Sequence, residues 1–348
     1  MPDPSPRRKP SRLVPILVLA VLAIIVAGWS ATWLWMRGQL ETRLDAGVSA
    51  LRRAGYEVSW REREIGGYPF RLDVTLTEAA VRDRSGWALE TPRLEAEAQA
   101  YAPIVWVLVA PDGLSFVRPR GGPVRVTGQS LRASLSHFDN TPPNISVELI
   151  EPVFKPAAGA EPFGLASAKQ VEFHLRQAPA EVGDEGGLWV SVKEGKAQLP
   201  GLLGRIAGDK PVSLEWDARL SKISAFHGAT WAEAVRRWIA AGGRINVKRA
   251  GLTAGDALIG AEAGSLSVGS DGRLRGSLEV SLRQAPRALS AMSATGAVSE
   301  TQAAAAKAVV EARAGSGDVA RANLDFQAGQ TTLGPVALAP APKVYEPR

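Results

Sequence analysis

Hydrophobic and polar positions follow different patterns in successive parts of the chain, and the first part is almost uniformly apolar. Residues 13–36 contain no charged side chain, and the apolar run is interrupted only at Pro15, Gly28, Ser30 and Thr32. A helix of about 20 apolar residues spans the hydrocarbon core of a bilayer, since it satisfies its backbone hydrogen bonds internally. Residues 13–36 are therefore predicted to form a single transmembrane helix.

Basic residues flank this segment unevenly, which predicts its orientation. Four basic side chains precede it, whereas only Arg37 follows immediately. Because a basic excess stays on the cytoplasmic side, residues 1–12 should form a cytoplasmic tail and everything beyond the span should be exported. We expect a single-pass protein of the inner membrane with its bulk in the periplasm.

Tryptophan residues mark the point where the predicted span leaves the membrane. Indole rings settle at headgroup level, so we place the outer interface at Trp29, Trp33 and Trp35. A cleaved signal peptide is the main alternative, because Gly28 and Ser30 are small enough for a signal peptidase. The apolar run is longer than the usual signal segment of about 7 to 15 residues. It also ends in bulky rings, which favours an uncleaved anchor.

The segment after the span, residues 37–55, has helical periodicity. Its apolar residues are spaced by four, four and three positions, and Gly55 is a typical C-terminal stop. We interpret it as a stalk helix that packs on the following domain. A coiled-coil dimer is an alternative, although the segment is short for one.

Beyond Tyr56 the apolar period changes to two, which is typical of half-buried strands. Alternation recurs from Phe70 to Leu76 and again within residues 94–100, 131–135, 145–149, 171–175, 188–192 and 214–220, with turn-rich spacers between. The expected fold is mainly β with appended helices (α+β), a long curved antiparallel sheet or half-open barrel over residues 56–348. An alternative division separates two β subdomains near residues 225–243.

Helices interrupt the strands at three places. Thr230 and Glu233 form a capping box before an amphipathic segment that ends at residues 242–243, and this helix is expected to cover the sheet. Two further helices are predicted over residues 286–292 and 299–313. Short glycine-punctuated strands lie between, and closing strands follow within residues 324–338.

The charge of the 348-residue chain is concentrated at its N-terminus. Residues 1–37 hold five of the 41 basic and one of the 35 acidic side chains, leaving 36 and 34 for the rest. The net charge of +6 therefore mainly reflects the membrane signal. No basic stripe with interleaved aromatic residues points to a nucleic-acid partner.

Residues that carry chemistry are sparse. The chain has no cysteine, which excludes disulfides, thiol nucleophiles and zinc thiolates. Its histidines, His137, His174 and His227, are far apart, and no nucleophile elbow or phosphate-binding loop is present. Paired acids such as Glu95 and Glu97 fall on the polar face of a predicted strand. We assign no catalytic, cofactor or metal-binding residue and expect no enzyme activity.

An ordered set of segments resembles a known family. It comprises the anchor and stalk, GGYPFR at residues 66–71, the helix and glycine-punctuated strands of residues 231–283, and LGPV at residues 333–336. These resemble the alphaproteobacterial family called domain of unknown function 2125 (DUF2125), over about residues 15–345. The family has no established activity, so the resemblance implies only a place in a Gram-negative envelope. Residues 243–283 also resemble AsmA-like envelope proteins, whose curved sheets surround lipid acyl chains.

The predicted sheet has more apolar surface than its few helices can cover, so a further partner is expected. Small inward residues would leave a concave groove open for the acyl chains of a phospholipid or other envelope lipid. The candidate groove-lining residues are Ala96, Ala98, Ala133, Leu135, Trp216, Ala218, Gly276 and Leu278.

Two other interpretations stay open. The sheet could close its own core, or the protein could be an envelope scaffold that recruits other envelope proteins by strand addition at its edges. A filled core of large side chains would favour the scaffold, and small residues around an unfilled concavity would favour lipid binding.

Overall fold

The computed structural model describes residues 13–197, 209–254, 257–283, 319–333 and 336–346, with three single positions between 300 and 310. The helix predicted over residues 286–292 lies outside the described residues, as do most positions of the one predicted over 299–313.

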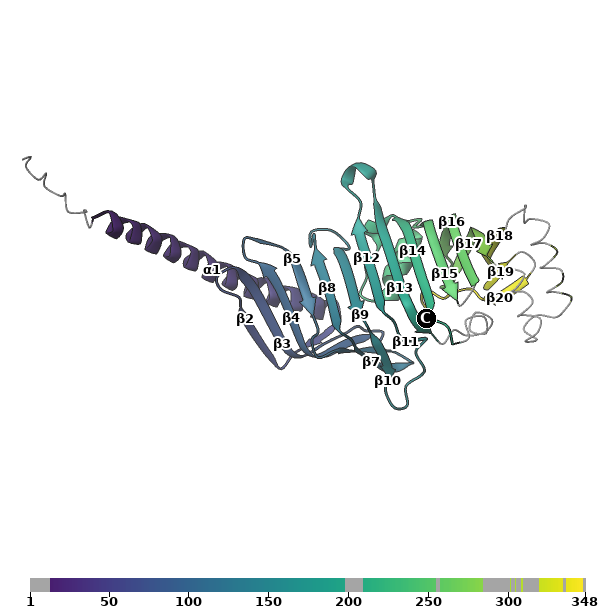
Figure 1. Ribbon diagram of the computed structural model, residues 1–348, viewed down its shortest axis with the longest axis horizontal. Coiled ribbons are helices and arrows are strands. Elements are labelled where there is room, and N and C mark those ends of the chain that lie inside the picture. Colours follow the sequence, from purple (N-terminus) through teal and green to yellow (C-terminus); the bar gives the residue numbers. More distant parts are fainter. Residues whose placement is uncertain are drawn as a thin grey trace, which may run out of the picture.

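One uninterrupted helix, α1 (Leu13–Arg53), contains both the predicted span and the predicted stalk. With 41 residues it is about 60 Å long. Among the helices of the described residues, α1 is long and apolar enough to cross a membrane. Figure 1 shows its first part projecting from the body and its last part running behind the sheet. Met36, where the span was predicted to end, therefore lies inside a continuous helix.

The rest of the described chain is dominated by antiparallel strands. Their bounds are β1 Glu57–Ser59, β2 Glu62–Gly66, β3 Arg71–Arg82, β4 Ala88–Gln99, β5 Ala102–Val109, β6 Leu114–Arg118, β7 Gly122–Thr127, β8 Ser130–Ser136, β9 Asn144–Ile150, β10 Val153–Pro156, β11 Leu165–Ser167, β12 Gln170–Gln177, β13 Glu185–Ala197, β14 Val212–Ser221, β15 Ile245–Ala254, β16 Ala257–Val268, β17 Leu274–Arg283, β18 Val319–Gln327, β19 Gln330–Leu333 and β20 Val336–Pro340.

These strands form one sheet with a branch. The main sheet runs β3-β4-β5-β8-β9-β12-β13 and then continues in sequence order from β14 to β20, with β1 and β2 both paired to β3. A second path leaves β4 through β6, β7, β10 and β11 and rejoins at β13, which closes a ring of ten strands. The predicted fold, a long antiparallel sheet that partly closes on itself, is confirmed.

Pairing continues through the region where a subdomain boundary was considered. β14 and β15 are joined by nine residue pairs, from Val212 with Ala254 to Leu220 with Ile245. The insertion between these strands holds a 3-10 turn, η2 (Ile223–Ala225), and helix α3 (Trp231–Ala240). A second 3-10 turn, η1 (Ala180–Val182), lies between β12 and β13.

Helix α3 begins with the predicted capping box. The Glu233 N–H donates to the Thr230 hydroxyl at 3.2 Å, and the Glu233 carboxylate accepts from the Ala229 N–H at 3.1 Å. The apolar face of α3 buries Val235 and Trp238 in a core with residues of the sheet. The predicted covering helix is therefore confirmed.

The C-terminal segment returns across the sheet and packs beside α3. Tyr345 is buried in the same core, and its hydroxyl donates to the Ser270 carbonyl oxygen at 3.1 Å. The Trp231 indole donates to the Val344 carbonyl oxygen at 2.7 Å, which ties this segment to the first turn of α3. Residues 341–346 thus cover part of the sheet in addition to the helix.

Candidate functional site: an apolar strip along the sheet

The register of the sheet aligns apolar residues from many strands in a single row. Residues that face each other in adjacent strands project from the same side of a sheet, so a chain of paired residues defines one face. One such chain, the central row, is Ile65, Val74, Ala96, Leu108, Ala133, Val147, Phe173, Val190, Trp216, Ala250, Ala261, Val280 and Ala322. It crosses thirteen strands without a charged or polar residue.

A second row lies on the same face, two positions along most strands and three along β15 and β16. It runs from Trp106 to Leu333 through Leu135, Ile145, Leu175, Leu188, Ala218, Val247, Gly264, Leu278 and Leu324. Bulges between Asp217 and Ala218 and between Ala261 and Ala263 keep the apolar residues in phase where strict alternation would have turned them outward.

The candidate groove-lining residues all map to this face. Ala96, Ala133 and Trp216 belong to the central row, while Leu135, Ala218 and Leu278 belong to the second. Ala98 is opposite Leu72, two positions from Ala96, and Gly276 is opposite Phe326 at the far end. The structure therefore brings residues separated by up to 182 positions in the sequence onto one surface.

This face is covered at three places. Near the N-terminal end, α1 packs against Leu72 and Ala100. The ring strands β6, β7 and β10 enclose a cluster around Ala110, Val126 and Leu131. Farther along, α3 and the C-terminal segment cover a core that includes residues of β12, β14 and β16.

The middle of the central row stays partly open, although Phe173 packs against the core that α3 covers. Its members at the far end, such as Val280, are buried, and Val74 at the near end is buried as well. Across eight consecutive neighbouring strands every member is only half-buried, and we call these residues the apolar strip: Ala96, Leu108, Ala133, Val147, Phe173, Val190, Trp216 and Ala250. With about 4.8 Å between strands, the strip is about 34 Å long.

The sequence did not single out several members of the strip. The predicted groove lining did not include five of them, because small inward residues are the sequence signal for a groove and local alternation does not show which strands are neighbours: Leu108, Val147, Phe173, Val190 and Ala250. Most of these residues lie in segments whose alternation of apolar and polar residues is evident in the sequence. Only the register of the sheet shows that they form one row. In it, β5 pairs directly with β8, although β6 and β7 come between them in the sequence.

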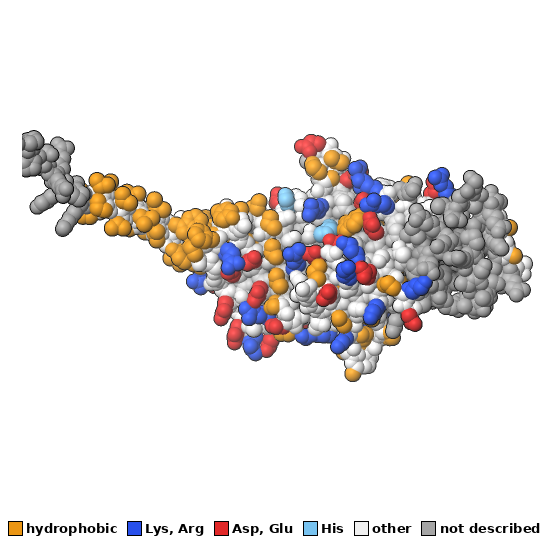
Figure 2. Space-filling model, in the orientation of Figure 1, with side chains coloured by type: hydrophobic (Ala, Val, Ile, Leu, Met, Phe, Trp, Pro, Cys, Tyr) orange, Lys and Arg blue, Asp and Glu red, His pale blue; other side chains and the backbone are white. Residues whose placement is uncertain are grey.

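The opposite face is polar. Figure 2 views the molecule from this side and shows blue and red side chains interspersed over the sheet. Cross-strand ion pairs there join Arg71 to Glu97 at 3.0 Å and Arg249 to Glu215 at 2.9 Å. The two faces thus differ as the alternating sequence requires.

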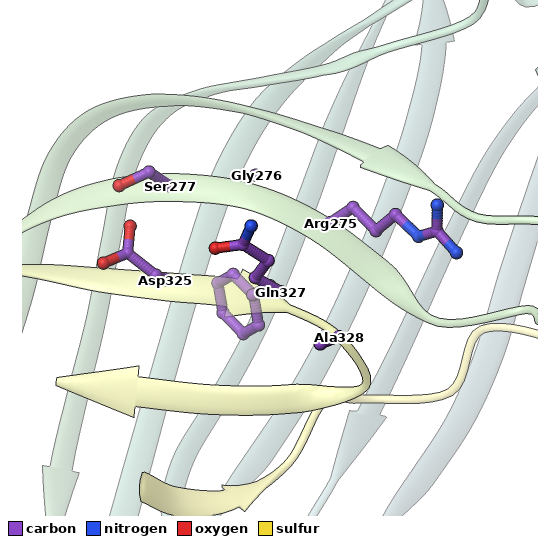
Figure 3. A pocket seen from close by; sticks show the side chains of 7 residues that line it. Arg275, Gly276, Ser277, Asp325, Gln327 and Ala328 are labelled. Carbon is purple, nitrogen blue, oxygen red and sulfur yellow. The ribbon is translucent and has the colours of Figure 1, made fainter. Parts of the chain in front are cut away.

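Gly276 lies in an open groove at the β17–β18 end of the sheet. The groove has a volume of about 680 Å³ and is lined by Arg275, Gly276, Ser277 and residues 325–328. Figure 3 shows polar side chains around much of it. Gly276 has φ +130°, and a Cβ there would lie 2.4 Å from the Ser265 carbonyl oxygen. Close approach of β16 therefore explains this glycine, independently of any ligand.

Two of the three tryptophans assigned to the membrane interface contact the β domain. The Trp29 and Trp33 indoles each donate a hydrogen bond of 2.8 Å, to the carbonyl oxygens of Pro69 and Arg71. Trp33 is 5% exposed and packs edge-on against Tyr68. Trp35 is 65% exposed and faces away from the domain. The GGYPFR segment is thus the docking site for the helix.

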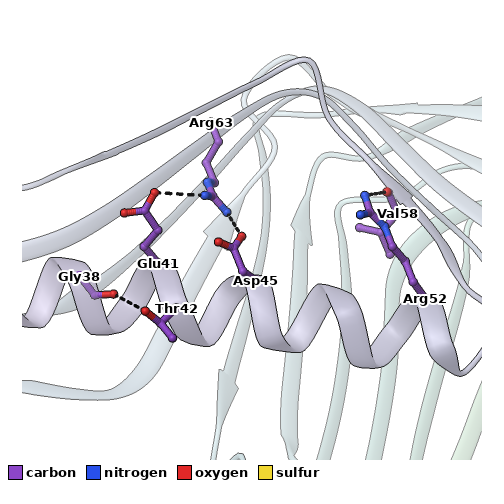
Figure 4. Close-up of polar contacts among 7 residues, drawn as sticks. All are labelled: Gly38, Glu41, Thr42, Asp45, Arg52, Val58 and Arg63. Carbon is purple, nitrogen blue, oxygen red and sulfur yellow. Dashed lines mark hydrogen bonds and ion pairs between the residues drawn. The ribbon is translucent and has the colours of Figure 1, made fainter.

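Nearer the C-terminal end of α1, an ion-pair cluster joins the helix to the sheet. Arg63 on β2 reaches Asp45 at 2.6 Å and Glu41 at 3.3 Å, and Arg52 donates to the Val58 carbonyl oxygen at 2.8 Å (Figure 4). The hydrogen bond and charge of Asp45 raise the pKa of the Arg63 guanidinium. The predicted packing of the stalk on the domain is confirmed by these contacts.

Potential metal ligands do not cluster in the part of the chain that the structure describes. No group of three or more His, Asp or Glu side chains there is arranged to hold a metal ion. His137 and His227 lie in exposed local contacts with Asn144 and the Ser224 carbonyl oxygen, respectively. His174 is on the polar face of β12, opposite Ser146.

Comparison with known proteins gives one family match. The model of a family described as "Uncharacterized protein conserved in bacteria (DUF2125)" matches residues 33–342. Comparison with curated proteins and with solved structures returned no significant match. The matched range includes the last part of the apolar segment, the GGYPFR docking site and the whole apolar strip.

Proposed function

The chain belongs to the DUF2125 family, as its sequence indicated, and because this family is uncharacterised we propose a function from the fold itself: the protein binds lipid acyl chains along the apolar strip while α1 anchors it in the inner membrane. The observation that carries the proposal is the half-buried central row. It is uniformly apolar across eight strands, and α1, the ring strands and α3 leave it partly exposed.

The dimensions of the strip suit this ligand. One leaflet of a bilayer contributes about half of the 30 Å hydrocarbon thickness. A strip of about 34 Å therefore has the length for one extended acyl chain or for two placed end to end. Each methylene that it removes from water contributes about 0.8 kcal/mol, so roughly ten carbons give useful affinity after the cost of immobilisation.

The position of the strip relative to α1 also supports the proposal. The strip begins at β4, the neighbour of β3, whose first residue accepts a hydrogen bond from Trp33 of α1, and it ends at β15. In Figure 1 the strands follow one another along the direction in which α1 enters the body. A lipid leaving the outer leaflet would meet Ala96 and Leu108 first.

Site-specific photo-crosslinking tests the proposal. We would place a benzophenone amino acid at Phe173 in the strip and, as a matched control, at Trp189 on the polar face of neighbouring β13. The full chain would be extracted from a Gram-negative envelope into polymer-bounded native discs and irradiated. Mass spectrometry should find a lipid adduct at position 173 and none at 189. Equal labelling at both positions, or no lipid at 173, would contradict lipid binding.

A blocking variant tests whether lipid enters from the membrane end. Ala133 lies in β8, between α1 and Phe173 along the central row. Ala133→Trp should abolish the adduct at position 173 while leaving the melting temperature near that of the parent chain, because Ala133 is only half-buried. If neither lipid content nor stability changes, the strip is not a binding groove and the scaffold interpretation replaces it.

Orientation is part of the proposal and has its own test. The basic excess before Leu13 favours a cytoplasmic N-terminus and a periplasmic body. A fluorescent reporter that matures only in the cytoplasm should stay dark when fused after Arg348, whereas a periplasmic phosphatase fused there should be active. A bright reporter and an inactive phosphatase would reverse the topology.

A further inference from the structure

The loop that docks α1 contacts the helix on the membrane side of its first exposed charge. The Ser30 and Tyr68 hydroxyls are 2.8 Å apart, and the Trp29 indole donates to the Pro69 carbonyl oxygen at 2.8 Å. Ser30 precedes Arg37 by seven residues, which is about 10 Å along a helix. If α1 spans the bilayer, this loop cannot lie wholly in water.

The composition of the loop agrees with that depth. Residues 65–70 contain no charged side chain, and the first charge after them is Arg71, which is ion-paired with Glu97. Tyr68 and Phe70 are aromatic, yet 52% and 67% of their surfaces are exposed. An exposed phenyl ring beside an apolar helix is poorly placed for water and well placed for lipid.

A second segment extends the same exposed surface. The Ala100 N–H donates to the Phe70 carbonyl oxygen at 2.9 Å, so the β4–β5 turn lies beside the loop. Tyr101 and Ile104 in that turn and the start of β5 are each 67% exposed. Figure 2 shows apolar side chains continuing from α1 onto the adjoining end of the body. We call the three aromatic residues Tyr68, Phe70 and Tyr101, together with the neighbouring Ile104, the aromatic rim.

We propose that the aromatic rim inserts into the outer leaflet of the same bilayer that α1 spans, beside the helix. This inference rests on α1 being the membrane anchor, and it does not require lipid in the apolar strip. Aromatic rings are suited to the boundary between headgroups and acyl chains, where the ring is buried, and the Tyr68 hydroxyl is already paired with Ser30. Insertion by about 5–10 Å is typical of interfacial anchors.

The rim also explains why the strip could fill from the membrane. Ile104 shares the apolar face of β5 with Trp106 and Leu108, and Leu108 is a member of the strip. A rim that inserts places acyl chains directly at the first strands of the strip. Lipid would then reach the strip without crossing water.

Spin labels measure the depth of the rim directly, because the chain has no cysteine of its own. Single-cysteine variants of the full chain, Phe70→Cys and Tyr101→Cys, would be labelled and reconstituted in phosphatidylethanolamine–phosphatidylglycerol vesicles. Trp35→Cys marks the lipid-exposed side of α1, and Val182→Cys, in an exposed turn, marks the aqueous phase. Power saturation with oxygen and with a nickel chelate gives the relative exposure of each label to lipid and to water.

We expect the labels at positions 70 and 101 to be several-fold less accessible to the nickel chelate than the label at 182, with oxygen accessibility close to that at 35. Nickel accessibility equal to that at 182 would overturn the proposal, because the rim would then lie in water. Protection from both reagents would also overturn it, because protein would then cover the rim. Neither of these two outcomes bears on lipid binding in the apolar strip, which the crosslinking experiment at Phe173 tests separately.

Discussion

The Trp33 indole N–H donates a hydrogen bond of 2.8 Å to the carbonyl oxygen of Arg71, 38 residues later in the chain. This bond joins the end of the predicted span to the first residue of β3. Trp33 is buried against Leu72 and Ala100, so the contact is both polar and apolar. The helix that could cross the membrane is therefore an integral part of the β domain.

Replacing Trp33 tests the strength of this docking. Trp33→Ala should lower the free energy of unfolding by about 3–5 kcal/mol, since it removes a buried ring and a hydrogen bond. Trp35→Ala, two residues away and exposed, is the matched control and should leave stability unchanged. Loss of β-sheet circular dichroism on heating the detergent-solubilised full chain measures both. An equal loss in the two variants would contradict docking through Trp33.

Arg63 should stabilise the contact between α1 and the sheet. Its side chain is only 18% exposed and bonds two acids on α1, whereas the neighbouring Arg61 is 57% exposed and pairs with Glu78 on β3. We expect Arg63→Ala to cost about 1.5–3 kcal/mol, because it removes two charge-assisted hydrogen bonds and a mostly buried side chain. Arg61→Ala should cost at most about 1 kcal/mol. Denaturant unfolding of both variants measures the difference in unfolding free energy. Equal losses in the two variants would contradict a special role for Arg63.

Gly276 should be intolerant of a side chain for a reason of backbone geometry. Gly276→Ala places a Cβ against the Ser265 carbonyl oxygen at a positive φ, so it should destabilise the protein by more than about 1 kcal/mol. Gly251→Ala is the control, because a Cβ there meets nothing within 4 Å. It should be neutral or stabilising by about 0.4–1 kcal/mol. Comparable melting temperatures for the two variants would refute this explanation.

Glu233 should make the stability of α3 dependent on pH. The hydrogen bond from the Ala229 N–H, assisted by Arg237, lowers the pKa of Glu233 below its ordinary value of 4.5. A lowered folded-state pKa means that the contribution is present above pH 4.5 and is lost as the pH falls through the folded-state value.

The melting temperature of Glu233→Gln should therefore lie below that of the parent chain at pH 7, and the gap should narrow below pH 4.5. Glu64→Gln, at an exposed position of β2, should show no such gap. A gap for Glu233→Gln that stays constant down to pH 3 would show that its carboxylate is not the cause.

Local patterns were sufficient to predict α1, α3 and many of the strands, although β5, β6, β7 and β10 were not predicted. The uncharged run before Arg37, the capping box at Thr230 and the alternation in β3 each identify their element from a few neighbouring residues, because these signals arise from short-range geometry. The antiparallel sheet and the DUF2125 family followed from the same segments and are confirmed.

What the sequence could not supply was which strands are neighbours. β4 pairs with β5 at one end and with β6 at the other. β5 in turn pairs with β8, which is separated from it in the sequence by β6 and β7. Such branching is set by tertiary packing, so the strip members Phe173 and Val190 could not be assigned to one row. The docking of Trp33 was missed for the same reason, since its partner is a backbone carbonyl.

Because α1 runs without a break from Leu13 to Arg53 and is fastened at both Trp33 and Arg63, the described structure contains no joint between anchor and body. The central row extends over twelve strand spacings, or about 58 Å. In a membrane-anchored chain, such a body would act as a lever on the helix. A load applied at β18 would then be transmitted through the paired strands to the bilayer as a change in the tilt of α1.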